Sequence, residues 1–213
     1  FVTMVSDFSK PLIYSGKQIK SKNRYFNKEV ARLKSYAEKY NKRKTTKRIR
    51  SLYVKRENQL QDVLHKISKH IVDTLVMDKV GTLICGMNEG WKDSIHIGKQ
   101  NNQTFVQIPY DTFISYLRYK CEMQGISFIV TEESYTSKCD ALAYEVIGKH
   151  EEYLGKRVKR GLFQSSVGKL INADVNGALN IMRKVVNDSE YIGRIIDSGW
   201  LYRPLILSSV YAL

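Results

Sequence analysis

Two apolar stripes at helical spacing, on either side of a strongly basic decapeptide, limit what this chain can fold into more than any other feature. The first stripe consists of Phe26, Val30, Leu33, Ala37 and Tyr40. The second consists of Leu60, Leu64, Ile67, Ile71 and Leu75. Steps of three and four residues bring side chains to one face of an α-helix. We therefore expect residues 23–75 to form an antiparallel helical hairpin whose stripes pack together, with residues 41–50 at its tip.

The net charge of the chain, +14, lies in the same part of the sequence. Residues 10–70 hold 19 lysines and arginines and only four acids, so the remainder is close to neutral. Charge localised in this way is typical of a surface that contacts phosphate backbones. The alternatives are an anionic membrane surface and a disordered basic arm, but such arms lack an apolar repeat. The tip cations that we expect to bind nucleic acid are Lys42, Arg43, Lys44, Lys47, Arg48 and Arg50.

Composition excludes several other classes of protein. The chain has 213 residues, of which 43% are hydrophobic, enough for the core of one domain with insertions. No apolar run approaches the ~18–20 residues of a membrane-spanning helix, and the first ten residues do not resemble a signal peptide. The three cysteines, an odd number, lie far apart, so a disulfide scaffold is not expected. A reducing, cytoplasmic location is the simpler interpretation.

Short apolar runs outside the hairpin predict strands. Residues 1–16 read as strand, turn and strand around a polar break that contains Pro11. The segments VGTLICG (80–86) and ISFIVT (126–131) predict two further strands, both buried.

Two helices are expected beside these strands. One covers residues 109–124, between Pro109 and Gly125. The other begins at Asn172, its candidate N-cap, or at the next residue, and runs to about Val186. We expect residues 134–171 to be irregular and assign no structure to the tail. This order of elements predicts an α/β domain with a mixed sheet.

Three blocks in series add a specific resemblance. They are ESYTSKCDAL (133–142), RGLFQSS (160–166) and NADVNGALNI (172–181). Their sequence and order resemble the C-terminal nuclease half of the TnpB/OrfB family, the RNA-guided nucleases of bacterial insertion sequences. The resemblance implies an RNase H-like (RuvC-type) fold and Mg²⁺-dependent cleavage of DNA, with DNA and a guide RNA as partners. No small-molecule substrate is expected.

The resemblance also implies which acids are catalytic. The family's last block carries an active-site Asp, which corresponds to Asp174 here. A subset of the family places its second acid in the ESYTSK block, which corresponds to Glu133. Most relatives place that acid after the strand matching VGTLICG, where this chain has none before Glu89, the fallback candidate. We expect Glu133 and Asp174 to bind Mg²⁺, because carboxylates can hold ions that activate water and stabilise the reacting oxygens.

Each of these acids has a structural alternative. Asp174 could serve only as a first-turn acid that favours its helix. Glu133 could be a solvated loop carboxylate. Its neighbour Glu132 would point to the opposite face of an extended strand, so the two are not expected to share a role.

A further acid is implied before the chain begins. The family's first catalytic Asp lies in a strand just upstream of the segment that matches Phe1, and Asp7 falls in the following turn, so it is not a substitute. Without that acid, residues 1–213 by themselves are expected to bind Mg²⁺ weakly and to cut nucleic acid poorly or not at all.

Many relatives carry a zinc ribbon with two CxxC pairs between the last blocks. This chain retains only Cys139, with His150 as the nearest other ligand type, and FQSSVG (163–168) replaces the second pair. A structural zinc site needs four such ligands, so we expect a zinc-free remnant. Cys85 and Cys121 are expected in the core, and His65 and His70 in structural roles on the hairpin. The cations of the remnant that could contact nucleic acid are Lys156, Arg157, Lys159 and Arg160.

These expectations divide the chain into five segments: N-terminal strands of a RuvC-like domain (1–22), a basic helical hairpin (23–75), a RuvC-like core (76–133), a degenerate ribbon-like insert (134–171), and a catalytic helix with a tail (172–213). The leading hypothesis is a TnpB-like, RNA-guided DNA endonuclease domain that lacks one catalytic acid. The first alternative is an inactive nucleic-acid-binding remnant of a mobile-element protein. The second is a membrane-surface or coiled-coil protein, which explains nothing of residues 126–181.

Overall fold

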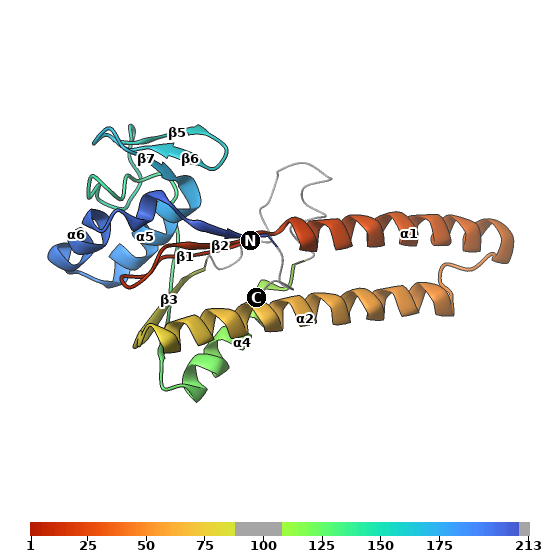
Figure 1. Ribbon diagram of the computed structural model, residues 1–213. Coiled ribbons are helices and arrows are strands. Elements are labelled where there is room, and N and C mark those ends of the chain that lie inside the picture. Colours follow the sequence, from red (N-terminus) through yellow and green to blue (C-terminus); the bar gives the residue numbers. More distant parts are fainter. Residues whose placement is uncertain (88–107, 209–213) are drawn as a thin grey trace.

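The computed structural model describes residues 1–87 and 108–208, and shows a mixed α/β protein with long helices and small sheets (Figure 1). The helices are α1 (Lys17–Asn41), α2 (Lys47–Met77), α4 (Tyr110–Met123), α5 (Ala173–Val185), α6 (Ser189–Asp197) and the 3₁₀ turn η1 (Trp200–Tyr202). The strands are β1 (Val2–Met4), β2 (Leu12–Tyr14), β3 (Thr82–Gly86), β4 (Ser127–Thr131), β5 (Lys156–Lys159), β6 (Leu162–Gln164), β7 (Leu170–Asn172) and β8 (Leu205–Leu207).

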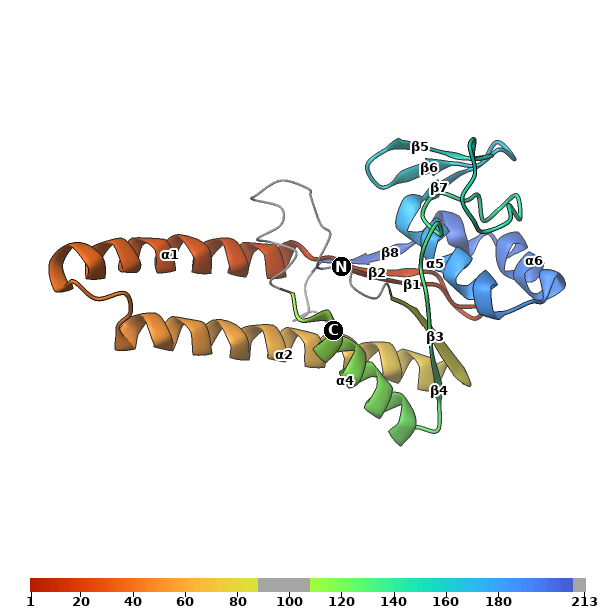
Figure 2. The ribbon, with the colours of Figure 1, turned by 180° about the vertical axis from the view of Figure 1, so that it is seen from behind.

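Helices α1 and α2 form an antiparallel hairpin that extends away from the body of the molecule (Figures 1 and 2). The Arg56 guanidinium donates to the Asn23 side-chain oxygen across the hairpin (2.9 Å), and the ring of Tyr53 meets that of Phe26 edge to face. Both helices are longer than the apolar stripes that predicted them. The turn between the helices is therefore only residues 42–46, and the tip consists of this turn and the first turn of α2, which begins at Lys47 with Thr46 as its N-cap.

One member of the first stripe is not in the core. Tyr40 is 62% exposed, although the stripe predicted that it would be buried, whereas Phe26, Val30 and Ala37 are buried as expected. On α1, Tyr40 is the stripe residue closest to the tip, and its ring packs instead against exposed Tyr36, with centroids 4.6 Å apart.

The strands of the described residues fall into three small sheets, not the single mixed sheet that was predicted. Strand β2 pairs with β1 antiparallel and with β8 parallel, so the first sheet is mixed. Strands β3 and β4 pair parallel in register Thr82 to Ser127. Strands β5, β6 and β7 form an antiparallel sheet within the segment that was predicted to be irregular. That prediction is wrong for residues 156–171, whose strands are short and too polar for apolar alternation to reveal them.

Two apolar cores hold these elements together. The first joins the inner half of α2 to α4 and the first strands, through residues such as Leu64, Ile67 and Leu117. The second surrounds α5 and α6, where Phe163, Leu179 and other apolar side chains meet. The tail is part of the body: η1 buries Leu201 in the second core, and β8 extends the first sheet.

The cysteines and hairpin histidines lie where structural roles were expected. Cys121 is fully buried and Cys85 is partly buried. The Tyr14 hydroxyl and Nδ1 of His70 share a hydrogen bond of 2.6 Å. The ring of His65 stacks on that of Tyr116, with centroids 3.8 Å apart. Among the described helices, none is long and apolar enough to cross a membrane.

Candidate functional site

Asp174 lies in the first turn of α5, and its side chain is exposed. Asn172 caps this helix: its side-chain oxygen accepts hydrogen bonds from the backbone amides of Asp174 (2.9 Å) and Val175 (3.3 Å). The predicted N-cap is therefore confirmed. Because Asn172 satisfies these amides, the Asp174 carboxylate is not needed as a cap and can serve another purpose.

Glu133 lies two residues beyond the end of β4 and is partly buried. Burial raises the pKa of its carboxyl group, the adjacent Glu132 raises it further, and Lys184 partly offsets both effects. After the larger effect of burial, the charge of Glu133 contributes to raising the pKa of the Tyr110 hydroxyl and of the Cys85 thiol, the latter to about 11. A carboxylate with these neighbours is not simply solvated, and a bound cation would stabilise its charge.

Both acids border the region around Phe1, at the start of β1. Asp174 is near enough to the backbone nitrogen of Phe1 for its charge to act there. The centroid of the Phe1 ring lies 5.7 Å from that of the Tyr110 ring. The charge of Glu133 contributes to raising the pKa of the Tyr110 hydroxyl. Helix α5 also packs against β1, β3 and β4. Asp174 lies at the start of α5, whereas Glu133 lies near Ile181 and Lys184 in the second half of that helix.

Glu132, the residue before Glu133, is held by Lys184. Its carboxylate and its backbone oxygen both accept from the Lys184 ammonium, at 3.0 and 2.7 Å. Lys184 lies in the last turn of α5, so this contact is at the opposite end of the helix from Asp174.

The end of β3 lies directly beside Glu133. A Cβ atom added to Gly86 would lie 2.5 Å from Cδ1 of Ile181 and 3.1 Å from Cβ of Glu133. A side chain at Gly86 would therefore require Ile181 and Glu133 to shift. Glu89, the fallback candidate, lies outside the described residues.

The β-hairpin of β5 and β6 lies beside the start of α5. All four residues of β5, Lys156–Lys159, are exposed, and the Arg157 guanidinium lies 3.8 Å from the Asp174 carboxylate. Arg160 follows in the turn between β5 and β6. An exposed ion pair of this kind adds little stability, so Arg157 can exchange Asp174 for a phosphate at small cost. Of the four predicted cations of this segment, Arg157 is thus the one that the structure places beside a candidate acid.

A buried carboxylate, Asp140, lies in the segment that was expected to be a zinc-free remnant. Asp140 Oδ2 accepts from the hydroxyl groups of Ser165 (2.8 Å) and Ser166 (3.0 Å) and from the Ser166 amide (2.7 Å). The Glu145 carboxylate accepts from the backbone amides of Asp140 (2.6 Å) and Leu154 (2.9 Å). Ser165 and Ser166 belong to FQSSVG (163–168). These hydrogen bonds, here called the Asp140 clasp, connect the loop after β4 to the loop after β6.

Two asparagines of the NADVNGALNI block tie α5 to the loop after β4. Asn176 accepts from the Ala141 amide (3.0 Å) and donates to the Cys139 carbonyl (2.9 Å). Asn180 donates to the carbonyls of Thr136 (2.9 Å) and Cys139 (2.7 Å). Sequence reasoning had assigned them no role. The available signal was their spacing, because buried amides four residues apart share one face of a helix.

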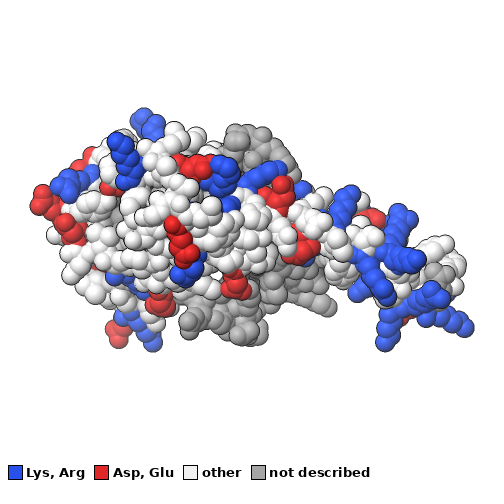
Figure 3. Space-filling model, turned by 90° about the horizontal axis from the view of Figure 1, so that it is seen from below, with Lys and Arg blue, Asp and Glu red and all other residues white. Residues whose placement is uncertain are grey.

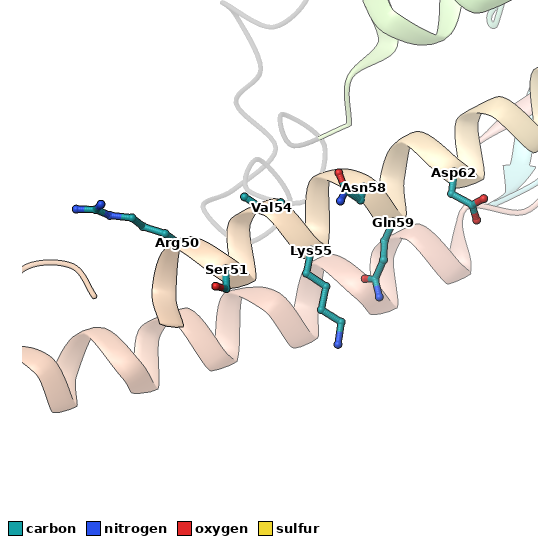
Figure 4. A pocket seen from close by; sticks show the side chains of 7 residues that line it. All are labelled: Arg50, Ser51, Val54, Lys55, Asn58, Gln59 and Asp62. Carbon is teal, nitrogen blue, oxygen red and sulfur yellow. The ribbon is translucent and has the colours of Figure 1, made fainter. Parts of the chain in front are cut away.

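The tip of the α1–α2 hairpin gathers cations at the far end of the molecule (Figure 3). Lys42, Arg43 and Lys44 are exposed in the turn, and Lys47, Arg48 and Arg50 are exposed on the first turn of α2. A shallow depression continues from there along α2 (Figure 4). It is lined by Arg50, Ser51, Val54, Lys55, Asn58, Gln59 and Asp62.

The donor chemistry of the two acids suits Mg²⁺, which prefers carboxylate oxygens and retains several waters. Within residues 1–87 and 108–208, however, no cluster of three or more His, Cys, Asp or Glu side chains could hold a metal ion. Among the described residues, Glu133 and Asp174 are therefore candidate ligands only and do not belong to a full metal site.

Two protein families match the chain in succession. Residues 1–92 match the OrfB_IS605 family, described as "Probable transposase". Residues 110–181 match the Cas12f1-like TNB domain, a segment that includes Glu133, Asp174 and the Asp140 clasp.

Individual relatives are distant and longer. The chain is 24% identical over 184 residues to the TnpB-like protein ORF457 of Acidianus two-tailed virus, across 82% of this chain and 37% of the viral protein. The cryo-EM structure of a Cas12f1–sgRNA–target DNA complex matches with a TM-score of 0.51 at 19% identity, over 78% of this chain and 42% of that one. The structural likeness shows the fold alone. Together the matches confirm the predicted resemblance to the TnpB/OrfB proteins.

Glu133→Gln is expected to raise the melting temperature by a few degrees near neutral pH. The pKa of Glu133 is raised in the folded chain, so its ionised form is less stable there than in the unfolded chain. This destabilisation is present above the raised pKa and disappears as the pH falls below the ordinary glutamate value, where both states bind the proton. Thermal unfolding from about pH 4 to pH 8 measures it. An increase in melting temperature of equal size at every pH, or an equal increase for the control Glu132→Gln, would show that ionised Glu133 does not destabilise the folded chain.

Asp140→Ala is expected to lower the free energy of unfolding by about 3 kcal/mol or more, because it leaves several buried donors without an acceptor. Urea denaturation measures the change. The control is Asp197→Ala at an exposed position on α6, for which less than about 0.5 kcal/mol is expected. Equal effects of the two substitutions would show that the Asp140 clasp does not hold the segment.

Proposed function

We propose that this chain is the nuclease portion of an RNA-guided DNA endonuclease that hydrolyses phosphodiesters with Mg²⁺. The observation that carries the proposal is the exposed carboxylate of Asp174 in the first turn of α5, 3.8 Å from the Arg157 guanidinium of the basic strand β5. The family matches support the reaction class. The similar Cas12f1 structure is a complex with an sgRNA and a target DNA, which supports the two partners.

Each described group has a distinct role in this proposal. Glu133 and Asp174 would hold Mg²⁺, which when bound supplies charge stabilisation and an acidified water. The half-buried position of Glu133 keeps its carboxylate oriented, and its raised pKa means that it binds a cation best once the pH exceeds that value. Arg157 and its neighbours in β5 would hold the phosphates of the strand next to Asp174.

The α1–α2 hairpin would bind a nucleic-acid backbone at a distance from the acids. Its exposed cations lie at the tip of a projecting arm, where they can reach a long polyanion without desolvation. Contacts of this kind position a guide RNA, or its duplex with DNA, without reading its sequence.

A second candidate function has an observation in its favour. The described residues do not bring a third carboxylate to Glu133 and Asp174, so this portion could bind nucleic acid without cutting it. The two functions make the same prediction for binding and opposite predictions for cleavage.

Asp174→Ala is expected to reduce Mg²⁺-dependent cleavage on the order of a hundredfold or more, while nucleic-acid binding is nearly unchanged. The measurement is cleavage of plasmid DNA by the protein that carries this chain, purified with its guide RNA. Asp188→Asn is the control, because it changes an acid at the start of α6 but keeps a capping side chain. Full cleavage by the Asp174→Ala protein would refute its catalytic role, and absence of cleavage by the unsubstituted protein would favour the binding function.

Replacement of Arg43, Lys44, Lys47 and Arg48 by Gln is expected to weaken binding and flatten its salt dependence. The slope of log Kd against log salt should fall by about 0.7–0.9 for each phosphate contact that is lost. Fluorescence anisotropy at several salt concentrations measures the slope. The control removes the same charge elsewhere, through Gln at Lys66, Lys69, Lys149 and Lys169. If both variants have the same slope, net charge rather than the tip determines binding.

A further inference from the structure

Helix α1 exposes three tyrosines among its cations. Tyr25 is 66% exposed, Tyr36 58% and Tyr40 62%, although the helix has a separate buried face formed by Phe26, Val30 and other apolar residues. Aromatic rings left this exposed on a long projecting helix contribute little to folding. Packing in the hydrophobic core therefore does not explain why these three positions hold tyrosine.

The three rings share one side of the helix. Tyr25 and Tyr36 are separated by three helical turns and Tyr40 lies one turn further, so the row is about 22 Å long at 1.5 Å per residue. The rings of Tyr36 and Tyr40 lie 4.6 Å apart with an interplanar angle of 37°. They form a partly stacked pair close to the basic tip. We refer to Tyr25, Tyr36 and Tyr40 as the tyrosine row.

Cations accompany the row. The Lys39 ammonium lies 5.3 Å from the centre of the Tyr40 ring. Lys28 and Arg32 are exposed on the adjoining side of α1, and Arg32 is paired with Glu29 at 2.9 Å. Toward the tip the row continues into the cations of the turn, Lys42 and Arg43. Flat aromatic faces and positive charges thus alternate along one side of the hairpin.

We propose that the tyrosine row stacks on unpaired bases, so that the hairpin binds a single-stranded segment of nucleic acid and not only the phosphates of a duplex. The inference rests on the proposed function in one respect: it assumes that the hairpin binds nucleic acid. Base faces supply the aromatic partners, and phosphates are the partners of Lys28, Lys39 and the tip. Every base has such a face, so little preference among bases is expected.

The chemistry favours unpaired bases over a duplex. In a duplex, base faces are covered by their neighbours and only base edges are accessible in the grooves. Tyrosines on the outside of a helix would meet a duplex only at its backbone, where a ring has no advantage over an aliphatic side chain. Unpaired bases can lie flat against Tyr36 and Tyr40, and each stack of this kind contributes substantially to binding.

The test compares the full chain with its Tyr36→Ala/Tyr40→Ala and Tyr36→Phe/Tyr40→Phe variants. The probes are a fluorescent single-stranded RNA of mixed sequence, the DNA of the same sequence, and the duplex of each. We expect the Ala variant to lose about tenfold or more in affinity for a single strand and less than about twofold for the duplexes. The Phe variant keeps both rings and should bind like the unsubstituted chain. Tyr119→Ala, an exposed tyrosine on α4, is the control.

Salt dependence separates this inference from the proposed function. The Ala variant should keep the salt slope of the unsubstituted chain, because no phosphate contact is removed. Two results would overturn the stacking proposal alone. In the first, the Ala variant loses equal affinity for single strands and duplexes. In the second, the Ala variant keeps its affinity for single strands while the tip variant still loses binding. If the tip variant also binds normally, the nucleic-acid role of the hairpin fails as well. A preference of the row for RNA over DNA, or the reverse, would identify which single strand it binds.

Discussion

The buried hydrogen bonds between α5 and the loop after β4 are the interaction on which the candidate site depends. Glu133 begins that loop and Asp174 begins the helix, 41 positions later in the sequence. Asn176 and Asn180 join the two through backbone groups of Thr136, Cys139 and Ala141. An unsatisfied buried amide is costly, so these contacts form together or not at all. They fix where one acid lies relative to the other, and the Asp140 clasp holds the intervening segment in place.

The candidate acids and the exposed cations are distributed differently over the molecule. The acids lie against the body of the molecule, where partial burial disfavours the ionised form of Glu133. The cations lie in two exposed places, β5 next to Asp174 and the hairpin tip far from it. A polyanion attracted by the tip would remain mobile along the arm, because exposed cations hold phosphates through long-range attraction more than through fixed geometry. At β5, by contrast, the Arg157 guanidinium lies within a few ångströms of a candidate catalytic acid.

The apolar periodicity of the sequence predicted the helices and strands that have continuous apolar patterns. It missed the elements that are held by hydrogen bonds of polar side chains. It located α2 and α4 because each buries a regular stripe in a core. It also located the strands β3 and β4 from their short apolar runs, but the expectation that both are buried was wrong, because their residues are exposed or only partly buried. It misplaced Tyr40, because a stripe does not reveal where the partner helix stops covering it. It also missed the β5–β7 sheet and the role of Asp140, whose stability comes from hydrogen bonds between distant segments. The catalytic roles of Glu133 and Asp174 came from the family resemblance and remain predictions.

Paramagnetic broadening by Mn²⁺ would test the central claim, that Glu133 and Asp174 can share one divalent ion. Mn²⁺ substitutes for Mg²⁺ at oxygen sites and broadens the NMR signals of nearby amides even when it binds weakly. The account predicts that the amides beside both acids broaden at the same Mn²⁺ concentration, and that Asp174→Ala removes the effect at both places. Broadening beside only one acid, or undiminished broadening beside Glu133 in that variant, would contradict the shared site.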